Sequence, residues 1–548
     1  MLRLISNIIL FLSSILYFLF KNFQKKLNIF LRGFKKFKVN LVNVPKKKNP
    51  KKQINVLIMD TVHHRLNIYT DCLLIEYLQN IFKCKITGLM EKNDNQSKSF
   101  FNFIKSSNII EINDSKIFQK LKFFFQAYKI IKNFKTYNIN KFIELKIDDI
   151  NLGRSVYDHI IRLTRIGKHR RFNSKFVNYL SDALYYKEKF TDIFKYNNFE
   201  YLILSELQFL PSNILIQVAL RHNVKVISRV LGPKKIGVRI YKKFEERFQS
   251  NNKIINAMFE KIPKKNLDKY SYIGFKKIKN IFKKTTNNPD FFSKKALTKQ
   301  KKFENKEDLL KYFGWKVEKK ICTIFSPNMI DGNFYHEMKL FPDIQTWLEE
   351  TLKIIKKSEQ NINFLIRPHP SESYFPKLIT KSENIFKEII GQHPYIKLCP
   401  NDCSPATVKE LTKIGITSHG SVGVEYPSFG IPVVIAGDSF YSGNGFNIEP
   451  QNIKDYIKTI KNLDKFINKS LNNNQIKLAR ALYYLHQFVI QMDCPLLDAK
   501  FDISDKKNFD NFISDANKLR KKYDIKKDNF FKKFNYQVIN NNSYLIND

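Results

Sequence analysis

Two segments of this chain each place polar residues directly after a run of buried-strand character. The first is Phe364-Leu-Ile-Arg-Pro-His-Pro370, and the second begins with Thr417-Ser-His-Gly-Ser-Val-Gly-Val-Glu425. In a parallel α/β sheet, ligands bind outside the carboxyl ends of the strands. The first segment brings a cation and an imidazole to such an end, and the second brings small residues, backbone N–H groups and a carboxylate. Together they predict a site for the phosphate or diphosphate of an activated sugar.

In the first segment, Arg367 and His369 are predicted to contact phosphoryl oxygens. Pro368 and Pro370 stiffen the turn and would hold the imidazole at the sheet edge. The Arg367 guanidinium can add a charge-assisted hydrogen bond. The alternative is that His369 only caps a turn at the end of a strand.

The second segment is predicted to end a strand and open a helix. Gly420 and Gly423 permit close approach of a ligand to the backbone, and a helix N-terminus binds phosphate through its N–H groups and dipole. Ser418 and Ser421 add hydroxyl groups. Glu425 is predicted to accept hydrogen bonds from ribose hydroxyls; the alternative is a favourable charge at a helix start.

A glycine-rich loop follows the next predicted strand, Val433–Ala436. Within it, Tyr441 and Gly443 are predicted to touch the donor sugar or phosphate, unless the loop is an ordinary surface turn. No Asp-x-Asp motif lies in a metal-binding context, so a metal-independent mechanism without a cofactor is expected. Charge on a leaving nucleotide would then be stabilised by Arg367, His369 and helix dipoles.

The composition restricts the class of partner. With 548 residues the chain can form two or three domains, and its net charge of +45 favours anionic partners. The lysines are spread over the whole chain, and the sequence has no RNA-recognition signature or zinc-finger spacing, so nucleic acid is not an expected partner. The six cysteines form no complete zinc set, and free thiols in a reducing cytosol are expected.

The amino-terminal segment is predicted to associate with a membrane. Leu4–Phe20 is nearly all apolar, and no Asp or Glu occurs from Met1 to Met59. Seventeen residues is the short limit for a membrane span, and the positive-inside rule would place everything after Phe20 in the cytoplasm. The alternatives are an amphipathic helix lying in the plane of an acidic membrane and an ordinary buried helix.

Strands that alternate with helices predict an α/β fold with parallel sheets. The two Rossmann-like domains would face a cleft, which is the GT-B architecture. The predicted parts are a hydrophobic and basic membrane anchor and linker (1–50), an amino-terminal Rossmann-like acceptor domain (54–250), a connector (251–316), a carboxyl-terminal Rossmann-like nucleotide-sugar domain (317–500) and a polar tail (501–548).

The Arg-Pro-His-Pro turn, the Ser-x-Gly-x-Glu helix start and the Phe-Tyr-x-Gly-x-Gly-Phe loop resemble capsular and surface polysaccharide biosynthesis proteins. That group includes GT-B Kdo transferases and, more distantly, sialic acid and CDP-glycerol transferases. The resemblance is strongest over 317–446, and it implies donor contacts for His369, Ser421 and Glu425. The chain lacks the Gln-Pro-Glu motif of the Kdo transferases, so the resemblance does not specify CMP-Kdo as the donor.

In a GT-B enzyme, the base that deprotonates the acceptor should come from the first domain. Asp60 and His63 are the first candidates, followed by Glu206; Asp331 in the second domain could also face the cleft. The predicted function is transfer of a sugar from a nucleotide-activated donor to a glycan or lipid-linked acceptor, on the cytoplasmic face of the plasma membrane of a bacterium. The alternatives are a polyol-phosphate transferase, a non-hydrolysing UDP-sugar 2-epimerase, and a non-catalytic scaffold of a capsule assembly complex.

Overall fold

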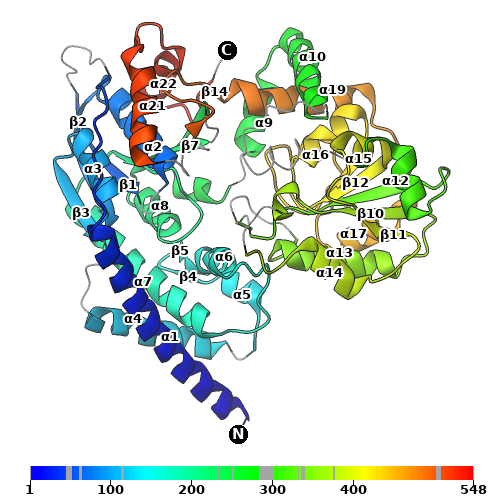
Figure 1. Cartoon of the computed structure of the whole chain (residues 1–548), viewed down its shortest axis with the longest axis horizontal. Helices are drawn as coiled ribbons and strands as arrows, with labels where there is room; N and C mark the ends of the chain where they lie inside the picture. Colours follow the sequence, from blue (N-terminus) through cyan, green and yellow to red (C-terminus); the bar gives the residue numbers. More distant parts are fainter. Residues whose placement is uncertain are drawn as a thin grey trace. The chain divides into compact units, whose positions relative to one another are not determined.

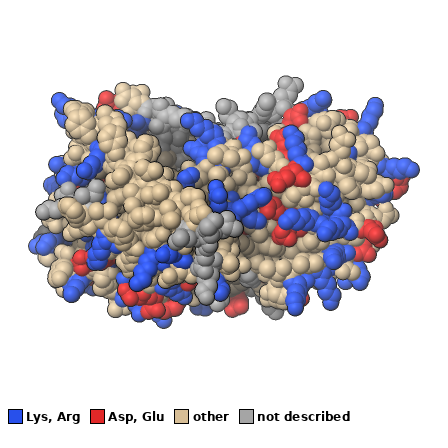
Figure 2. Space-filling model, turned by 90° about the horizontal axis from the view of Figure 1, so that it is seen from below, with Lys and Arg blue, Asp and Glu red and all other residues tan. Residues whose placement is uncertain are grey.

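The structure is a computed structural model that describes residues 2–44, 52–60, 64–112, 117–134, 136–230, 234–249, 252–282, 302–330, 332–334, 340–373, 377–501 and 508–546. The chain forms two compact units. Unit 1 contains residues 1–160, 170–247 and 490–548, and unit 2 contains residues 161–169 and 248–489. The surface is basic: on the face seen in Figure 2, Lys and Arg side chains are far more frequent than Asp and Glu.

The sheet of unit 1 is doubly wound. Among the described residues it has seven strands in the order β14-β8-β7-β6-β1-β2-β3, and only β8 runs antiparallel to its neighbours. The chain passes from β1 to β2 and β3, and then returns to β6 on the other side of β1. The strands β1, β2 and β3 are neighbours in Figure 1. The strands are β1 (Gln53–Asp60), β2 (Lys83–Glu91), β3 (Asn108–Ile112), β6 (Tyr201–Ile203), β7 (Lys225–Val230), β8 (Lys235–Tyr241) and β14 (Met492–Asp493).

A short hairpin and a set of helices complete unit 1. They are α1 (Leu2–Gly33), α2 (Arg65–Leu78), α3 (Asn95–Phe103), α4 (Ile117–Asn133), α5 (Ile139–Ile143), β4 (Lys146–Ile147), β5 (Ile150–Asn151), α6 (Leu152–Thr164), α7 (Ser174–Tyr196), α8 (Ser212–Arg221), η1 (Phe244–Arg247), α21 (Phe509–Lys521) and α22 (Asn529–Ile539). The last residues of α6 belong to unit 2.

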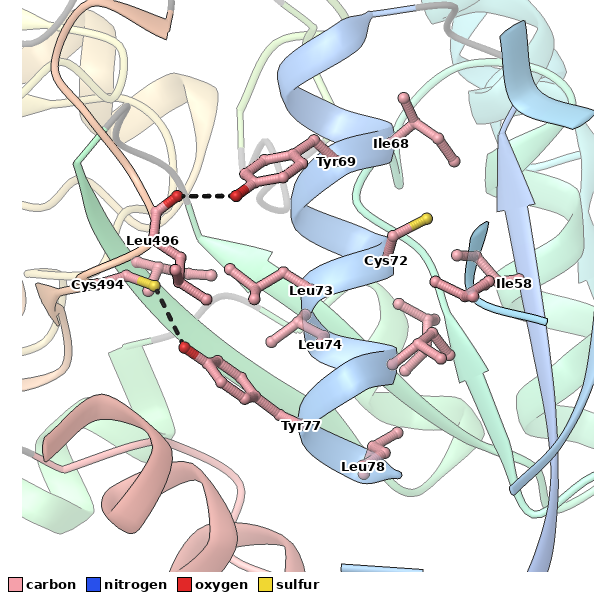
Figure 3. Packing of buried hydrophobic residues seen from close by; sticks show 14 of the residues in the cluster. Ile58, Ile68, Tyr69, Cys72, Leu73, Leu74, Tyr77, Leu78, Cys494 and Leu496 are labelled. Atoms are coloured by element: carbon pink, nitrogen blue, oxygen red, sulfur yellow. Dashed lines mark hydrogen bonds between the residues drawn. The ribbon is translucent and has the colours of Figure 1, made fainter. Parts of the chain in front are cut away.

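Helix α2 is buried on both sides, and Figure 3 shows why. Ile68 and Cys72 point toward the sheet residue Ile58, while Tyr69 and Tyr77 point the other way, toward the segment that follows β14. Tyr69 donates a hydrogen bond to a backbone oxygen of that segment at 3.1 Å. Every residue of α2 from Ile68 to Leu78 is buried, and its apolar side chains lie at the centre of the unit 1 core.

The carboxyl-terminal region is part of this core, which corrects the prediction of a polar tail over 501–548. α21 and α22 bury a row of aromatic side chains against α2: Phe509, Phe512, Phe530, Phe531 and Phe534. Arg520 of α21 donates to Glu76 of α2 at 2.6 Å, and both side chains are buried. The polar residues of this region lie on the outer faces of two amphipathic helices. The overall composition of 501–548 is polar, and it does not reveal that the apolar residues of these helices share one face that packs against the core.

Helix α1 is the element of the described chain that is long and apolar enough, over Ile5–Gly33, to cross a membrane by length and composition. It does not stand apart from the protein as an anchor and linker. It packs along α7 and α4, where Phe18 is buried and its ring is tilted against that of Phe124, with ring centroids 5.1 Å apart. The sequence predicted the helix but not its docking.

Unit 2 has the same strand order as the parallel core of unit 1, β7-β6-β1-β2-β3. Its described strands form a parallel sheet in the order β11-β10-β9-β12-β13. β9 and β13 are buried throughout, as expected for strands of a parallel sheet covered on both faces, while β12 has one exposed residue, Lys413. The strands are β9 (Ile321–Phe325), β10 (Asn363–Arg367), β11 (Ile396–Leu398), β12 (Thr412–Thr417) and β13 (Val433–Ile435).

The helices of unit 2 include those of the predicted connector. α9 and α10 belong to unit 2, and α10 packs against α19 with Tyr270 near Tyr484, so 251–282 is part of a domain. The helices are α9 (Asn252–Glu260), α10 (Lys264–Ile281), α12 (Lys306–Phe313), α13 (Ile344–Lys356), η2 (Pro370–Ser373), α14 (Ser382–Ile389), α15 (Pro405–Leu411), α16 (Val422–Glu425), η3 (Pro427–Phe429), α17 (Ile453–Lys461), α18 (Asp464–Ile467), α19 (Asn473–Tyr484) and η4 (Leu485–Val489).

The predicted fold class is confirmed: the chain has two α/β units with parallel sheets and an apolar amino-terminal helix. A cleft between the units stays a prediction.

Candidate active site

The predicted donor site of unit 2 lies at the carboxyl ends of three neighbouring strands. β10 and β12 flank β9, and Arg367 and Thr417 both pair with Phe325, the last residue of β9. The chain passes from β9 to β10 and β11 and returns to β12 on the other side of β9. This is a topological switch point, where α/β sheets bind ligands. The His369 turn and the Ser418–Glu425 turn therefore begin at the same level of the sheet.

The imidazole of His369 has a defined tautomer. Its Nδ1 lies 3.2 Å from the backbone N of Ser371, which can only donate, and 2.7 Å from Ser371 Oγ. Asn328 Nδ2 in turn donates to Ser371 Oγ at 3.2 Å. Because Nδ1 accepts, the neutral ring carries its proton on Nε2. His369 thus has the N–H donor that a contact with a phosphoryl oxygen requires.

Arg367 ends β10 as predicted, but its guanidinium binds the loop after β11. Nη1 donates to the backbone oxygen of Pro400 at 2.9 Å and contacts Cys399 Sγ at 3.1 Å, and Nη2 donates to the backbone oxygen of Cys403 at 3.1 Å. Burial alone would raise the pKa of Cys399, but the hydrogen bond from Cys403 and the guanidinium lower it to about 7. In this arrangement Arg367 positions the loop, and its contact with phosphate stays a prediction.

The helix predicted after β12 is a single turn. α16 ends at Glu425 and the chain continues as η3 from Pro427, because Pro427 lacks the N–H group that would extend the helix. Ser421 precedes the turn at the N-cap position, makes no side-chain capping hydrogen bond there, and is exposed. One turn has a small dipole, so phosphate binding here would depend on the first N–H groups and the Ser421 hydroxyl.

Glu425 is half-buried at the end of this turn. Burial raises the pKa of its carboxyl above the ordinary value, and a hydrogen bond with the Ser421 side chain opposes that shift. Both protonation states of a carboxyl can bond a hydroxyl. The position of Glu425 therefore agrees with the predicted contact to a ribose, which stays a prediction.

Tyr441 and the nearby glycines shape the turn. The Tyr441 side chain is fully buried, and its hydroxyl donates to the backbone oxygen of Gly420 at 2.6 Å. A Cβ on Gly423 would collide with the Tyr441 ring, so this position requires glycine. Gly443 has a φ of +81° and donates its N–H to Glu449 Oε1 at 2.8 Å. The buried ring makes Tyr441 a support for the turn rather than the direct donor contact that the sequence predicts.

Two titratable residues at this edge were not among the predicted site residues. His419 Nδ1 lies 2.9 Å from Ser418 Oγ, and burial lowers the pKa of His419 to about 4, so its ring is neutral at pH 7. Glu372 accepts hydrogen bonds from Ser382 N at 3.1 Å and Ser382 Oγ at 2.6 Å, yet burial raises its pKa to about 7. The sequence did contain a signal, because His419 lies within the second motif and Glu372 comes two residues after the first.

The switch point of unit 1 also gathers polar groups. Ser205 follows β6, and Arg229 lies at the end of β7. Arg229 Nε donates to Ser205 Oγ at 2.8 Å and its Nη2 donates to Asn67, while Ser205 Oγ donates to Asp71 of α2. Sequence reasoning missed Asp71 and Arg229, because one lies inside a helix and the other inside a strand.

The predicted bases are placed as follows. Asp60 ends β1 at the switch point, is buried, and accepts a hydrogen bond from Ser97 Oγ at 2.7 Å. Glu206 follows β6, but its carboxylate accepts the backbone N–H two residues further on at 2.6 Å, which is a local capping role. His63 and Asp331 lie outside the described residues.

Asp71 is expected to lower the stability of unit 1 as the pH rises. Burial raises its pKa from 3.8 to about 7, although Arg229 and the bond from Ser205 oppose this. Because the folded state holds the proton more tightly than the unfolded state, stabilisation present below the unfolded pKa is lost as pH rises through the folded pKa. In urea unfolding, the free energy of unfolding of Asp71→Asn should rise relative to that of the native chain as the pH increases from 3.8 to about 7. A pH-independent difference would contradict the assignment.

Within the described ranges, no group of three or more His, Cys, Asp or Glu side chains is arranged to hold a metal ion. The metal-independent mechanism stays a prediction.

The two units define an α/β protein with two doubly wound sheets, one parallel and one mostly parallel, and with polar groups at both switch points. No family model and no curated protein matches the chain. Among solved structures, it is similar to a beta Kdo 2,4 transferase, KpsC of Thermosulfurimonas dismutans, with 12% identity and a TM-score of 0.34 over 57% of this chain and 87% of that chain.

Two further solved structures span more of the chain. A glycosyltransferase from Rickettsia africae is 10% identical with a TM-score of 0.26, over 86% of this chain and 100% of that chain. The UDP-GlcNAc 2-epimerase from Neisseria meningitidis, bound to UDP-GlcNAc, is 11% identical with a TM-score of 0.24, over 79% of this chain and 95% of that chain. With identities and TM-scores this low, the fold assignment rests on the sheets of this chain itself.

Proposed function

We propose that this protein is a glycosyltransferase of surface polysaccharide assembly that transfers a sugar from a nucleotide-activated donor to a glycan or lipid-linked acceptor. Unit 2 binds the donor, and unit 1 binds the acceptor. The observation that carries the proposal is the pair of turns at the unit 2 switch point: the N–H donor of His369 follows β10, and the Ser421 turn follows β12.

In this proposal, the chemistry is the stabilisation of a leaving nucleotide. The His369 Nε2–H donates to a phosphoryl oxygen, and the Ser421 hydroxyl and the N–H groups of its turn bind the neighbouring oxygens. Glu425 accepts hydrogen bonds from the ribose. Arg367 acts through the loop that it holds. No step requires a metal ion, and the reaction would take place on the cytoplasmic face of a bacterial plasma membrane.

His369→Ala is expected to weaken binding of the nucleotide-sugar about tenfold or more, because a hydrogen bond to a charged group contributes about 1.5–3 kcal/mol. The donor is first identified by thermal-shift screening with CMP-, CDP-, UDP- and GDP-sugars, and affinity is then measured by calorimetry. NMR of the product distinguishes transfer from 2-epimerisation of the donor.

His393→Ala is the matched control. His393 Nδ1 also accepts the backbone N–H two residues further on, at 3.2 Å, but His393 precedes β11 and so lies at the opposite edge of the same sheet. This variant should keep the native affinity. Equal affinities for both variants and the native protein would remove His369 from the donor site.

A further inference from the structure

The inner face of α1 is bound to the folded unit by polar as well as apolar contacts. Lys21 Nζ forms an ion pair with Asp182 of α7 at 2.5 Å and donates to the backbone oxygen of Asn178 at 3.3 Å. Asn178 Nδ2 donates to the backbone oxygen of Ser14 at 3.0 Å. At the far end of α1, Arg32 forms an ion pair with Glu91 of β2. The helix is therefore held at several points along its length.

These contacts exclude a membrane-spanning position for α1 in this fold. Lys21 directly follows the apolar run, and Asp182 belongs to a helix of the globular unit. If α1 crossed a bilayer, it would have to leave α7 and α4, and both Asp182 and the buried apolar residues beneath α1 would lose their partners. Phe124, which is fully buried and contacts Phe18 of α1, would be uncovered, and uncovering a large apolar side chain is unfavourable.

The outer face of α1 is a continuous exposed apolar stripe. The exposed apolar residues of α1 recur at intervals of three and four, which places them on one side of the helix, and Phe34 directly after the helix continues the row: Ile5, Ile8, Ile9, Leu12, Leu16, Leu19, Phe20, Phe23, Leu27, Phe30, Leu31 and Phe34. At 1.5 Å per residue the stripe is roughly 45 Å long. Phe118 and Phe125 of α4, which are 79% and 52% exposed, extend it sideways.

The charges around the stripe indicate what covers it. The first 59 residues contain no Asp or Glu, and exposed lysines lie beside the carboxyl-terminal half of the stripe and just beyond it: Lys26, Lys35, Lys36 and Lys38. A long apolar stripe with basic residues at its margin matches the interface of an anionic bilayer, where apolar side chains enter the acyl boundary and lysines meet the headgroups.

We propose that α1 lies in the plane of an anionic lipid bilayer, with its outer stripe in the headgroup and acyl boundary and its inner face bound to unit 1. The protein is then attached to one leaflet and does not cross the membrane. This attachment is independent of the reaction that the protein catalyses. It brings unit 1 to the lipid surface, where a lipid-linked acceptor would be found.

The test uses the full chain and two kinds of vesicle, pure phosphatidylcholine and a mixture of phosphatidylcholine with phosphatidylglycerol. The native protein should cosediment with the mixed vesicles and more weakly with the neutral ones. The double variant Leu16→Glu, Phe23→Glu changes two side chains that are 68% and 66% exposed, so the fold should be retained. Its binding should fall at least about tenfold. Deleting α1 is the poorer test, because it would uncover α4 and α7.

Tyr272→Glu is the control, since Tyr272 lies on α10 of unit 2 and is 73% exposed; its vesicle binding should be native. Alkaline carbonate should release the native protein from cell membranes. Retention after carbonate would overturn the in-plane position in favour of a span. Unchanged vesicle binding of the double variant would overturn the role of the stripe. Absence of vesicle binding, with a dimer that the double variant abolishes, would show that a second copy covers the stripe.

Discussion

Arg520→Met is expected to destabilise unit 1 by about 3–5 kcal/mol, because it leaves the buried carboxylate of Glu76 without its cation. Arg520 Nη2 lies 2.6 Å from Glu76 Oε2, and the two side chains are 1% and 7% exposed. The loss should appear as a lower urea midpoint for the unfolding of unit 1, measured by circular dichroism.

Lys518→Met is the matched control on the same helix. Lys518 pairs with Asp515 at 3.0 Å, but its side chain is 72% exposed, and exposed pairs contribute only about 0–1 kcal/mol. The double variant Glu76→Leu, Arg520→Met should recover much of the loss, because it removes both charges. If Arg520→Met and Lys518→Met unfolded at the same midpoint, the buried pair would not stabilise the fold.

Asp60→Asn is expected to reduce transfer about 10²–10⁴-fold, which is the usual effect of removing a general base. Donor affinity should stay native, because the predicted donor residues belong to unit 2. Asp60 is the predicted base that ends a strand at the unit 1 switch point. Turnover at saturating donor and donor affinity by calorimetry separate the two effects.

Glu206→Gln is the comparison for this variant. Its carboxylate caps a backbone N–H of its own loop, so only a small loss of turnover is expected. Full activity of Asp60→Asn would show that the base lies elsewhere, and a large loss in Glu206→Gln alone would identify it. A loss of donor affinity in Asp60→Asn would overturn the division of labour between the two units.

The central strands could be predicted from the sequence, because a buried parallel strand is a short apolar run that ends in polar residues. β1 and β10 have this form and end in Asp60 and Arg367, while β9 and β13 are buried throughout.

The edge of the unit 1 sheet could not be predicted in this way. β8 contains Arg239, and a charged residue does not indicate a buried strand. In the fold its side chain is nevertheless buried, and its guanidinium carbon lies 3.9 Å from the ring centroid of Tyr241. β14 has only two residues and pairs with β8 from a distant part of the chain.

In the candidate site as well, the sequence predicted where residues lie along the strands but not what their side chains contact. The sequence indicated that Arg367 and His369 lie at a strand end, and both do. It could not show that the Arg367 guanidinium turns to the loop after β11, since that depends on a neighbouring strand. Asp71 and Arg229 were missed for a related reason: their proximity comes from the winding of the sheet, and no local pattern marks it.

The return of the chain to unit 1 has a consequence for synthesis on the ribosome. Unit 1 contains residues 1–160 but also needs 490–548, which supply β14, α21 and α22. Domains generally fold as they emerge, the first before the second. Here the order should be reversed: unit 2 is complete once residue 489 has emerged. The nascent amino-terminal half must wait for residues 490–548, and until they emerge α2 is uncovered on one side. Until then that half is the expected target of chaperones.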